Sequence, residues 1–501
     1  MQKQIFLIFL ILIILIFIPI SLSFIVLPID TLPRENYKLS SDNNPHNDYI
    51  NSQYQSIFFT ELEMGTPSQK IPLLLKTEVS SYIVTSINSI EGCTSYKYRD
   101  VYNFSESFFN NYDFYNESKS KSFILNDCDY GRFYEAEQVC NSNETFSFYQ
   151  DINLKNKTIK EKVYFEFMRN VEDNITGEIG LNLYDKNKRS FNSFLNILKT
   201  NKLIDNYNWY FHFDSWDNNK GKLIVGSLPH EDFPKNYIED DLNYAKVESN
   251  SFLNYWRMQF DKIYIKSNNN INIYFNETVA EFKFDNNIII GTYEYENYLL
   301  SIIGKYLDQQ KCFSSNISDY KLYSNKLRFY YCKNENNIKN ELYDLIPTIY
   351  LYYNQFNYTI EIKKDDLFKI NNGYIYYQVL FGTQNNKIWF LGRPISLKYK
   401  FVFNPETKQI GFYRNYYNDN EDSSANKSDN NNNNNSLIIK ICVIIVLSIL
   451  LVALGVIIGK KIYGIKKKKR ANELLDDYDY TTDENNNNNV YNVNENIGIN
   501  N

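Results

Sequence analysis

Two lysines, Lys76 and Lys283, lie in or directly at the end of extended apolar runs. Lys76 ends the extended run IPLLLK, directly before a second extended run, and Lys283 lies in AEFKFDNNIIIGT, two residues before Asp285. A lysine ammonium has three hydrogen-bond donors and no acceptor, so it cannot serve as an ionised base. In a partly dry site Lys76 opposite Asp285 would form a compensated pair, whereas Lys76 opposite Lys283 would be a repulsive one.

The sequence contains no motif for several other kinds of chemistry. The histidines, His46, His212 and His230, are scattered, and there is no HExxH motif or Cys/His cluster, which argues against a zinc site. The absence of a GxSxG elbow and of a P-loop argues against a serine hydrolase and a nucleotide-binding protein, and we expect no cofactor. A net charge of −6 argues against nucleic-acid binding.

The elements that must position these lysines are mostly strands. From 56 to 417 the chain consists of short runs rich in Tyr, Ile, Phe and Val, many alternating and separated by turn residues. Helical periodicity is scarce, and its two best examples are FNSFLNILKT at 191–200 and YLLSIIGKYL at 298–307. The region is too long for one sandwich, so we predict a mainly β fold with two lobes, 56–245 and 246–417.

Both ends of the chain carry targeting patterns. Residues 1–23 predict a signal peptide, and 24–55 is a polar leader or propeptide-like segment without periodicity. An Asn-rich linker at 418–436 precedes a predicted transmembrane helix at 437–459, and the seven basic residues behind that helix predict a disordered cytosolic tail at 460–501. We therefore expect a single-pass type I protein of the secretory pathway, at the cell surface or in an endolysosomal membrane.

The region between the two hydrophobic segments has the marks of a lumenal or extracellular glycoprotein. Ten N-x-S/T sequons lie there, one of them inside the Asn run at 434–436, and the other nine are the candidate glycosylation sites. They are Asn103, Asn116, Asn143, Asn156, Asn174, Asn276, Asn316, Asn357 and Asn426. Five of the six cysteines also lie there, where disulfides form. Closeness in sequence favours a Cys128–Cys140 bridge, which leaves Cys93 free or bonded to another chain.

Several segments, in order, resemble the pepsin-like aspartic proteases. Gly65-Thr66-Pro67-Ser68-Gln69 matches that family's Gly-Thr-Pro-x-Gln, and counting on without a gap places Lys76-Thr77-Glu78-Val79-Ser80 on the first catalytic motif, Asp-Thr-Gly-Ser-Ser. Near the other end, LGRPISLKYKFVFNPETKQIGFYR has the family's Leu-Gly, Tyr, Val-Phe and Ile-Gly-Phe in register. GEIGLNLYD, NWYFHF with GKLIVGSLPHEDF, and YWRMQFDKIYI are similar to further family segments. The resemblance covers about 56–417.

The resemblance implies a two-lobed fold whose central cleft accepts an extended peptide. In the family, two aspartates at the lobe junction share one proton and activate a water against the scissile carbonyl. Lys76 falls on the first aspartate and either Lys283 or Asp285 on the second, so no catalytic dyad is intact. The resemblance also implies a Cys312–Cys332 disulfide, and a tyrosine on the flap over the cleft, for which Tyr149 is the candidate.

We therefore expect a catalytically inactive member of this family. It would be a membrane-anchored glycoprotein that binds an extended peptide or protein as an added strand, or that has a structural role. The alternative is an active membrane-anchored aspartic endopeptidase with a divergent dyad. A third interpretation, an unrelated adhesion-type β protein, is disfavoured by the order of the matched segments.

Overall fold

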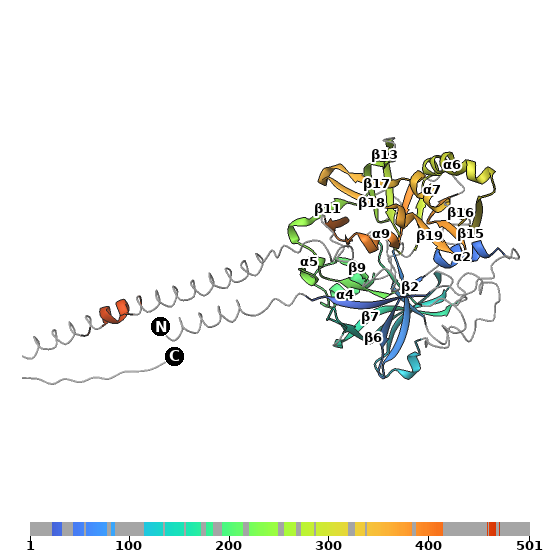
Figure 1. Cartoon of the computed structure of the whole chain (residues 1–501). Coiled ribbons are helices and arrows are strands. Elements are labelled where there is room, and N and C mark those ends of the chain that lie inside the picture. Colours follow the sequence, from blue (N-terminus) through green and yellow to red (C-terminus); the bar gives the residue numbers. More distant parts are fainter. Residues whose placement is uncertain are drawn as a thin grey trace, which may run out of the picture. The chain divides into compact units, whose positions relative to one another are not determined.

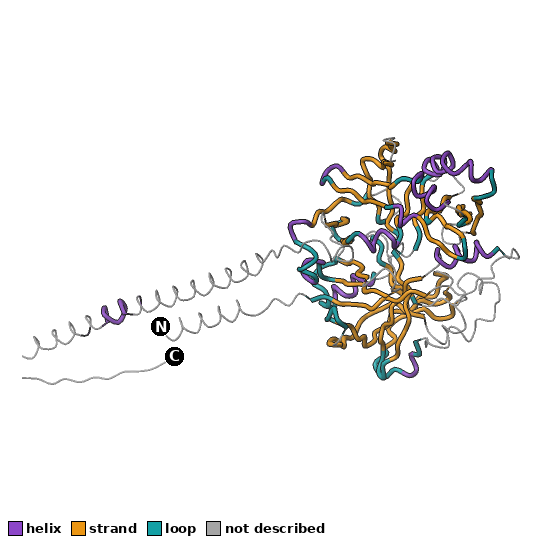
Figure 2. The backbone as a smooth tube through the Cα atoms, viewed as in Figure 1, coloured by secondary structure: helices purple, strands orange, loops and turns teal. Residues whose placement is uncertain are grey.

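The short alternating runs of the sequence fold into strands, and these assemble into two large sheets (Figures 1 and 2). The fold is mainly β, as predicted. Ser21–Asn418 forms one compact unit, and Met1–Ile20 with Asp419–Asn501 forms a second. The computed structural model describes residues 23–32, 44–54, 57–77, 82–85, 115–133, 136–154, 157–171, 177–183, 193–213, 220–248, 255–266, 272–284, 287–318, 326–335, 338–382, 387–413, 458, 460–466 and 470.

The first sheet has 13 strands. They are β1 (Ile25–Leu32), β2 (Ile57–Met64), β3 (Gln69–Lys76), β4 (Tyr82–Thr85), β5 (Ile124–Phe133), β6 (Ala136–Tyr149), β7 (Lys157–Val171), β8 (Glu178–Gly180), β9 (Trp209–Phe213), β10 (Lys220–Val225), β11 (Leu242–Lys246), β23 (Phe401–Asn404) and β24 (Gln409–Tyr413). Their order is β11-β24-β23-β9-β10-β1-β2-β3-β8-β4-β7-β6-β5. Because β23 and β24 come from the end of the second predicted lobe, sheet membership does not follow the predicted boundary at 245/246.

The second sheet has 11 strands. They are β12 (Arg257–Lys266), β13 (Asn272–Phe282), β14 (Ile289–Gly291), β15 (Cys312–Ser318), β16 (Lys326–Lys333), β17 (Thr348–Tyr353), β18 (Tyr358–Ile362), β19 (Phe368–Asn371), β20 (Tyr374–Tyr377), β21 (Val379–Gly382) and β22 (Ile388–Leu391). Their order is β18-β17-β12-β13-β22-β14-β21-β16-β20-β19, and β15 pairs with β16. The predicted Cys312–Cys332 disulfide is present and joins β15 to β16.

Helices lie around the sheets rather than between their strands (Figure 2). They are α2 (Pro45–Tyr54), α4 (Phe194–Thr200), α5 (Pro229–Asp232), α6 (Tyr293–Asp308), α7 (Ile338–Leu345), α8 (Lys364–Leu367) and α9 (Arg393–Lys398), with the 3-10 turns η2 (Glu117–Lys119), η3 (Glu239–Asp241) and η4 (Asn354–Phe356). Both predicted helices are confirmed as α4 and α6. Each begins at a hydroxyl cap, because the Ser193 and Thr292 side chains accept from the backbone N–H groups of Asn196 and Tyr295.

The segment at 24–55 carries regular structure that its sequence pattern does not show. β1 lies between β10 and β2 in the first sheet, and α2 packs Ile50 and Tyr54 onto the second. Ile25, Val26 and Leu27 are all buried. A strand that is buried on both faces reads as a continuous apolar run. Here that run follows the signal-peptide pattern directly, so it could not be recognised as a separate strand.

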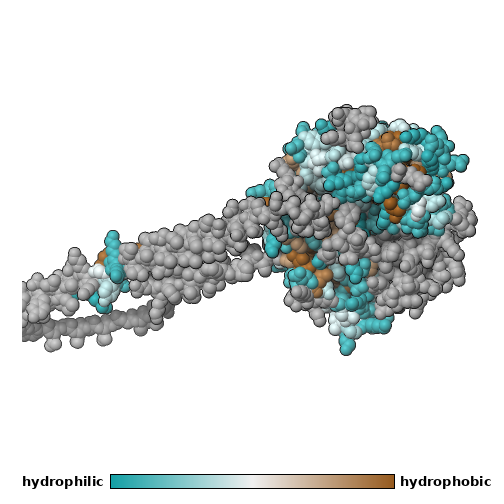
Figure 3. All heavy atoms as spheres, viewed as in Figure 1, coloured by the Kyte–Doolittle hydropathy of each residue, from teal (hydrophilic) through white to brown (hydrophobic). Residues whose placement is uncertain are grey.

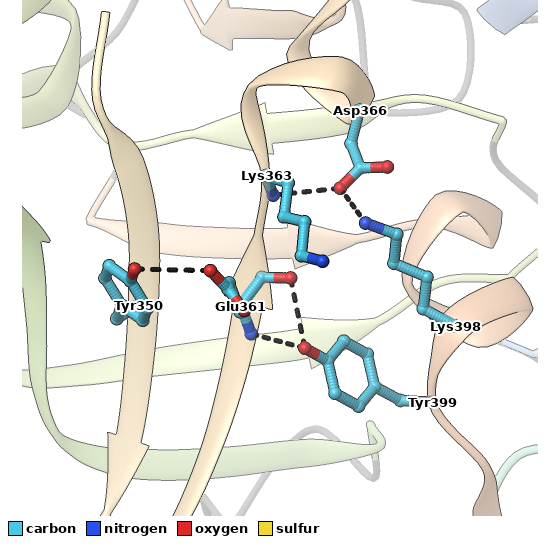
Figure 4. Close-up of polar contacts among 6 residues, drawn as sticks. All are labelled: Tyr350, Glu361, Lys363, Asp366, Lys398 and Tyr399. Carbon is cyan, nitrogen blue, oxygen red and sulfur yellow. Dashed lines mark hydrogen bonds and ion pairs between the residues drawn. The ribbon is translucent and has the colours of Figure 1, made fainter. Parts of the chain in front are cut away.

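The free edge of β18 is closed by a side chain (Figure 4). The backbone N–H of Glu361 donates to the Tyr399 hydroxyl at 2.6 Å, and the Glu361 carbonyl accepts from the same hydroxyl at 3.1 Å. Beside it, the Lys398 ammonium pairs with Asp366, which also accepts from the backbone N–H of Lys363 at 2.9 Å. Burial raises the pKa of Tyr399 to about 12, so its proton stays in place for this contact.

Several predicted features lie at or beyond the limits of the described residues. The signal peptide and the span at 437–459 are almost wholly outside them, and within them no helix has the length and apolar character needed to cross a membrane. Asn316 and Asn357 are exposed sequons, and the view in Figure 3 shows a mostly hydrophilic described surface. Four of the nine candidate glycosylation sites and Cys93 are outside the described residues: Asn103, Asn156, Asn174 and Asn426. The backbone register sets Cys128 opposite Cys140.

Candidate functional site: two lysines at matching strand ends

Lys76 and Lys283 follow the same strand arrangement, once in each sheet. In the first sheet β3 runs parallel to β8 and ends with Lys76 opposite Gly180, while β8 pairs antiparallel with β4. In the second sheet β13 runs parallel to β22 and ends with Phe282 opposite Leu391, while β22 pairs antiparallel with β14. In both sheets a strand from later in the chain is therefore inserted between two strands that follow each other in sequence.

This repeated arrangement makes Lys283, rather than Asp285, the counterpart of Lys76. One step beyond the Phe282–Leu391 pair sets Lys283 level with Gly392, just as Lys76 is opposite Gly180. Asp285 comes two residues later and lies outside the described residues. The sequence alone allowed either residue, and the need to compensate the charge of Lys76 favoured Asp285. The register favours Lys283, and the structure supplies the compensating charge from another source.

Lys76 is balanced by a glutamate on the neighbouring strand. Its Nζ lies 2.6 Å from Glu178 Oε2, and the two side chains are 23% and 8% exposed. Glu178 is opposite Leu74, two residues before Lys76, so the carboxylate and the ammonium project from the same face of adjacent strands. Such a pair is held by Coulomb attraction at a site where losing either partner leaves a charge in poor solvation.

Lys283 belongs to a more deeply buried group of three charges. Its Nζ lies 3.6 Å from Glu281 Oε1, and these side chains are 8% and 3% exposed. The other oxygen of Glu281 accepts from both Nε and an Nη of Arg257, each at 2.8 Å. The Lys283 ammonium also lies 5.1 Å from the centre of the Phe390 ring, a cation–π contact. Glu281 thus joins two cations from β12 and from the end of β13.

A chain of hydrogen bonds connects the two lysine positions through Trp256. The Leu181 N–H donates to the Lys76 carbonyl at 2.8 Å, and the indole Nε1 of Trp256 donates to the Leu181 carbonyl at 2.8 Å. The Phe282 N–H, directly before Lys283, donates to the Trp256 carbonyl at 2.9 Å. Trp256 is buried and therefore fixes the two strand ends relative to each other.

The charges at this site determine which chemistry it can perform. Sharing a proton between two acids requires two carboxyl groups that face each other. Among the described residues here, the two carboxylates are Glu178 and Glu281, and each faces a cation on its own sheet. The two positions that the resemblance assigns to the dyad hold ammonium groups, which can only donate. Within the described residues, the two ammonium groups are hydrogen-bond donors for an acceptor group.

Tyr149 and Tyr130 occupy different places in the first sheet. Tyr149, the flap candidate, ends β6 opposite Lys157 and also pairs with Val26 of β1. Its side chain packs on the cluster that contains Val26 and Tyr210, as an ordinary strand tyrosine would. Tyr130 stands near the turn of the β5–β6 hairpin at the edge of the sheet and is followed by Gly131.

Comparisons with known proteins assign no family to this chain. No protein-family model matches it, and no curated protein matches its sequence. Its function must therefore be inferred from the two lysines and the groups that hold them.

Proposed function

We propose that this protein is a catalytically inactive pepsin-like membrane glycoprotein that binds an extended peptide segment of a partner. The observation that carries the proposal is the presence of a lysine at both matching strand ends, each beside a glutamate of its own sheet. The repeated insertion of β8 and β22 supports the pepsin-like fold, because the resembling segments of the sequence supply those strands.

Hydrolysis by the aspartic mechanism fails for a chemical reason. A water molecule between the strand ends needs one carboxylate to take its proton and one acid to polarise the substrate carbonyl. Lys76 and Lys283 offer donors only, and their positive charges oppose the transfer of a proton to either residue. Glu178 and Glu281 cannot substitute, because their oxygens already hold Lys76, Lys283 and Arg257.

Binding of a peptide uses what remains of such a site. An extended segment presents backbone carbonyls at regular intervals, and these are acceptors for ammonium groups. Lys76 is the better placed of the two lysines, because its side chain is 23% exposed, against 8% for Lys283. We assign Lys76 the role of ligand donor and Lys283 a structural role within the second sheet.

The test is a peptide-hydrolysis assay with the full-length protein, from acidic to neutral pH, with and without a statine-type transition-state mimic. We expect no turnover that the mimic inhibits. An Asp285→Asn variant is the matched control for the alternative dyad. Inhibitor-sensitive turnover that is lost in this variant would replace the proposal with an active endopeptidase. Binding is measured in parallel with an extended-peptide library, and Lys76→Met is expected to weaken retention at least several-fold.

A further inference from the structure

The first sheet has only a short backbone pairing between β9 and β23 in its described part, which we call the β9–β23 joint. The strands β11, β24 and β23 pair with one another over several residues. Within the described residues, their connection to the rest of the sheet is a single register pair, Phe403 opposite Trp209. Ring stacking of Trp209 on Phe403, with centroids 4.4 Å apart, adds packing at this place. Few backbone hydrogen bonds therefore hold the two parts of the sheet together here.

A buried lysine supplies a further bond across this joint. Lys400, directly before β23, is only 5% exposed. Its ammonium donates to the Phe211 carbonyl of β9 at 2.8 Å and lies 3.4 Å from Nδ1 of His212. The His212 ring stacks on Phe233, with centroids 4.1 Å apart. A partly buried imidazole and a buried ammonium are thus in contact where the two parts of the sheet meet.

The other charged groups around His212 fall on two sides. Lys222 of β10 is its cross-strand partner, which adds a second cation. The Tyr210 ring lies 5.5 Å from the Lys400 ammonium, and the Tyr210 hydroxyl donates to Asp232 on α5. Among the described residues, a proton on His212 would therefore enter a group that already contains two lysines, and Tyr210 stands between this group and the Asp232 carboxylate.

We propose that the β9–β23 joint is an acid-sensitive latch: a proton on His212 would place a second positive charge beside the buried Lys400 ammonium, so acid favours the form in which the two strands are separated and His212 is protonated. The latch is closed at neutral pH and opens in an acidic compartment. This inference does not depend on peptide binding or on the absence of catalysis, because it concerns only the joint.

The direction of the pH effect follows from the two states of His212. Burial, Lys400 and Lys222 lower the pKa of His212 to about 2 in the closed form. In the open form the pKa returns to about 6.5, so the open form alone takes up a proton between these values. The opening equilibrium then rises about tenfold for each pH unit below 6.5, which is about 100-fold at pH 4.5. Burial raises the pKa of Asp232 in the closed form. Protonation of Asp232 therefore favours the closed form and opposes opening.

The other two histidines contact tyrosine hydroxyls rather than an ammonium. His46 Nδ1 lies 2.7 Å from the Tyr376 hydroxyl, and His230 Nδ1 lies 2.9 Å from the Tyr413 hydroxyl. A tyrosine hydroxyl can accept as well as donate a hydrogen bond, so neither contact sets an imidazole against an ammonium. His230→Phe therefore provides a matched control for a change at His212.

The experiment measures hydrogen exchange in the full-length protein between pH 7.5 and 4.5, corrected for the intrinsic pH dependence of exchange. Peptides that cover β9, β23 and β24 should lose protection by up to about 100-fold at pH 4.5. His212→Phe keeps the stack on Phe233 and should remove this response, whereas His230→Phe should retain it. If His212→Phe does not fold, Lys400→Met replaces it and should reduce the response. Protection that stays constant with pH in the natural protein, or an equal response in His212→Phe, overturns the latch.

Discussion

The two lysine sites resemble each other in strand arrangement and differ in burial. Lys76 pairs with a glutamate on the adjacent strand, and about a quarter of its side chain is exposed. Lys283 shares Glu281 with Arg257, and all three are nearly enclosed. The same residue type at equivalent strand ends can thus be partly accessible in one sheet and a buried structural member in the other. Mutations that alter charge should separate these roles.

Glu281→Gln should produce the largest loss of stability. It removes the one negative charge that Arg257 and Lys283 share inside the second sheet, and breaking such a buried group costs about 3–5 kcal/mol. The measurement is the free energy of unfolding from urea titration of the full-length protein. A combined Arg257→Met, Glu281→Leu and Lys283→Met variant removes all three charges and should recover most of the loss. A Glu281→Gln protein as stable as the natural one would show that the network is not buried in solution.

Glu178→Gln should cost less, about 1–3 kcal/mol, because Lys76 keeps partial contact with water. The same urea titration measures this change, with Lys76→Met combined with Glu178→Leu as the charge-free control. The comparison is between the losses of unfolding free energy in Glu281→Gln and in Glu178→Gln. If the two losses are equal, the assignment of an accessible role to Lys76 and a structural role to Lys283 fails.

Tyr399→Phe extends the comparison to a neutral buried hydrogen bond. The change deletes the hydroxyl that serves both backbone groups of Glu361, which should cost about 1 kcal/mol. Thermal unfolding of the full-length protein measures the loss. Tyr352→Phe, on the adjacent strand with its hydroxyl on exposed Asn354 and Asn357, is the matched control and should be close to neutral. A larger loss for Tyr352→Phe would contradict a special function of the Tyr399 hydroxyl.

Lys70→Ala should have the smallest effect of the series. Lys70 pairs with Glu61 at 3.6 Å, but the two side chains are 67% and 34% exposed. An exposed ion pair contributes at most about 0.5 kcal/mol, and added salt screens it. Urea titration at low and high salt tests both statements. A loss comparable with that of Glu178→Gln would mean that burial does not govern the strength of these lysine contacts.

Local signals in the sequence were enough for the class of fold and for several elements. Alternating runs gave the strands, helical periodicity indicated α4 and α6, and the Cys312–Cys332 disulfide that the resemblance implied is present. β1 was missed because an apolar strand after an apolar signal pattern has no visible boundary. The sequence supplied the segments around the lysines, but it could not decide between Lys283 and Asp285, because that choice depends on the register between β13 and β22.

The partners of the lysines were missed for a different reason. Glu178 and Glu281 each lie directly beside buried apolar residues, and a charged residue at such a position is a sequence signal for a buried ion pair. Which cation it meets depends on strands that come together from distant parts of the chain. Trp256 was visible as part of a resembling segment, yet its indole bond to Leu181 is a tertiary contact that no periodicity predicts.

The hydroxyl of Tyr399 has a consequence for the solubility of the protein in a crowded compartment. It occupies the donor and the acceptor of Glu361, the places that a foreign strand would use to attach to β18. This hydroxyl therefore blocks the addition of a strand at Glu361 on the edge of the sheet. Besides its cost in stability, Tyr399→Phe should leave both backbone groups of Glu361 open to an added strand, so we expect the variant to associate through β18 more readily than the natural protein.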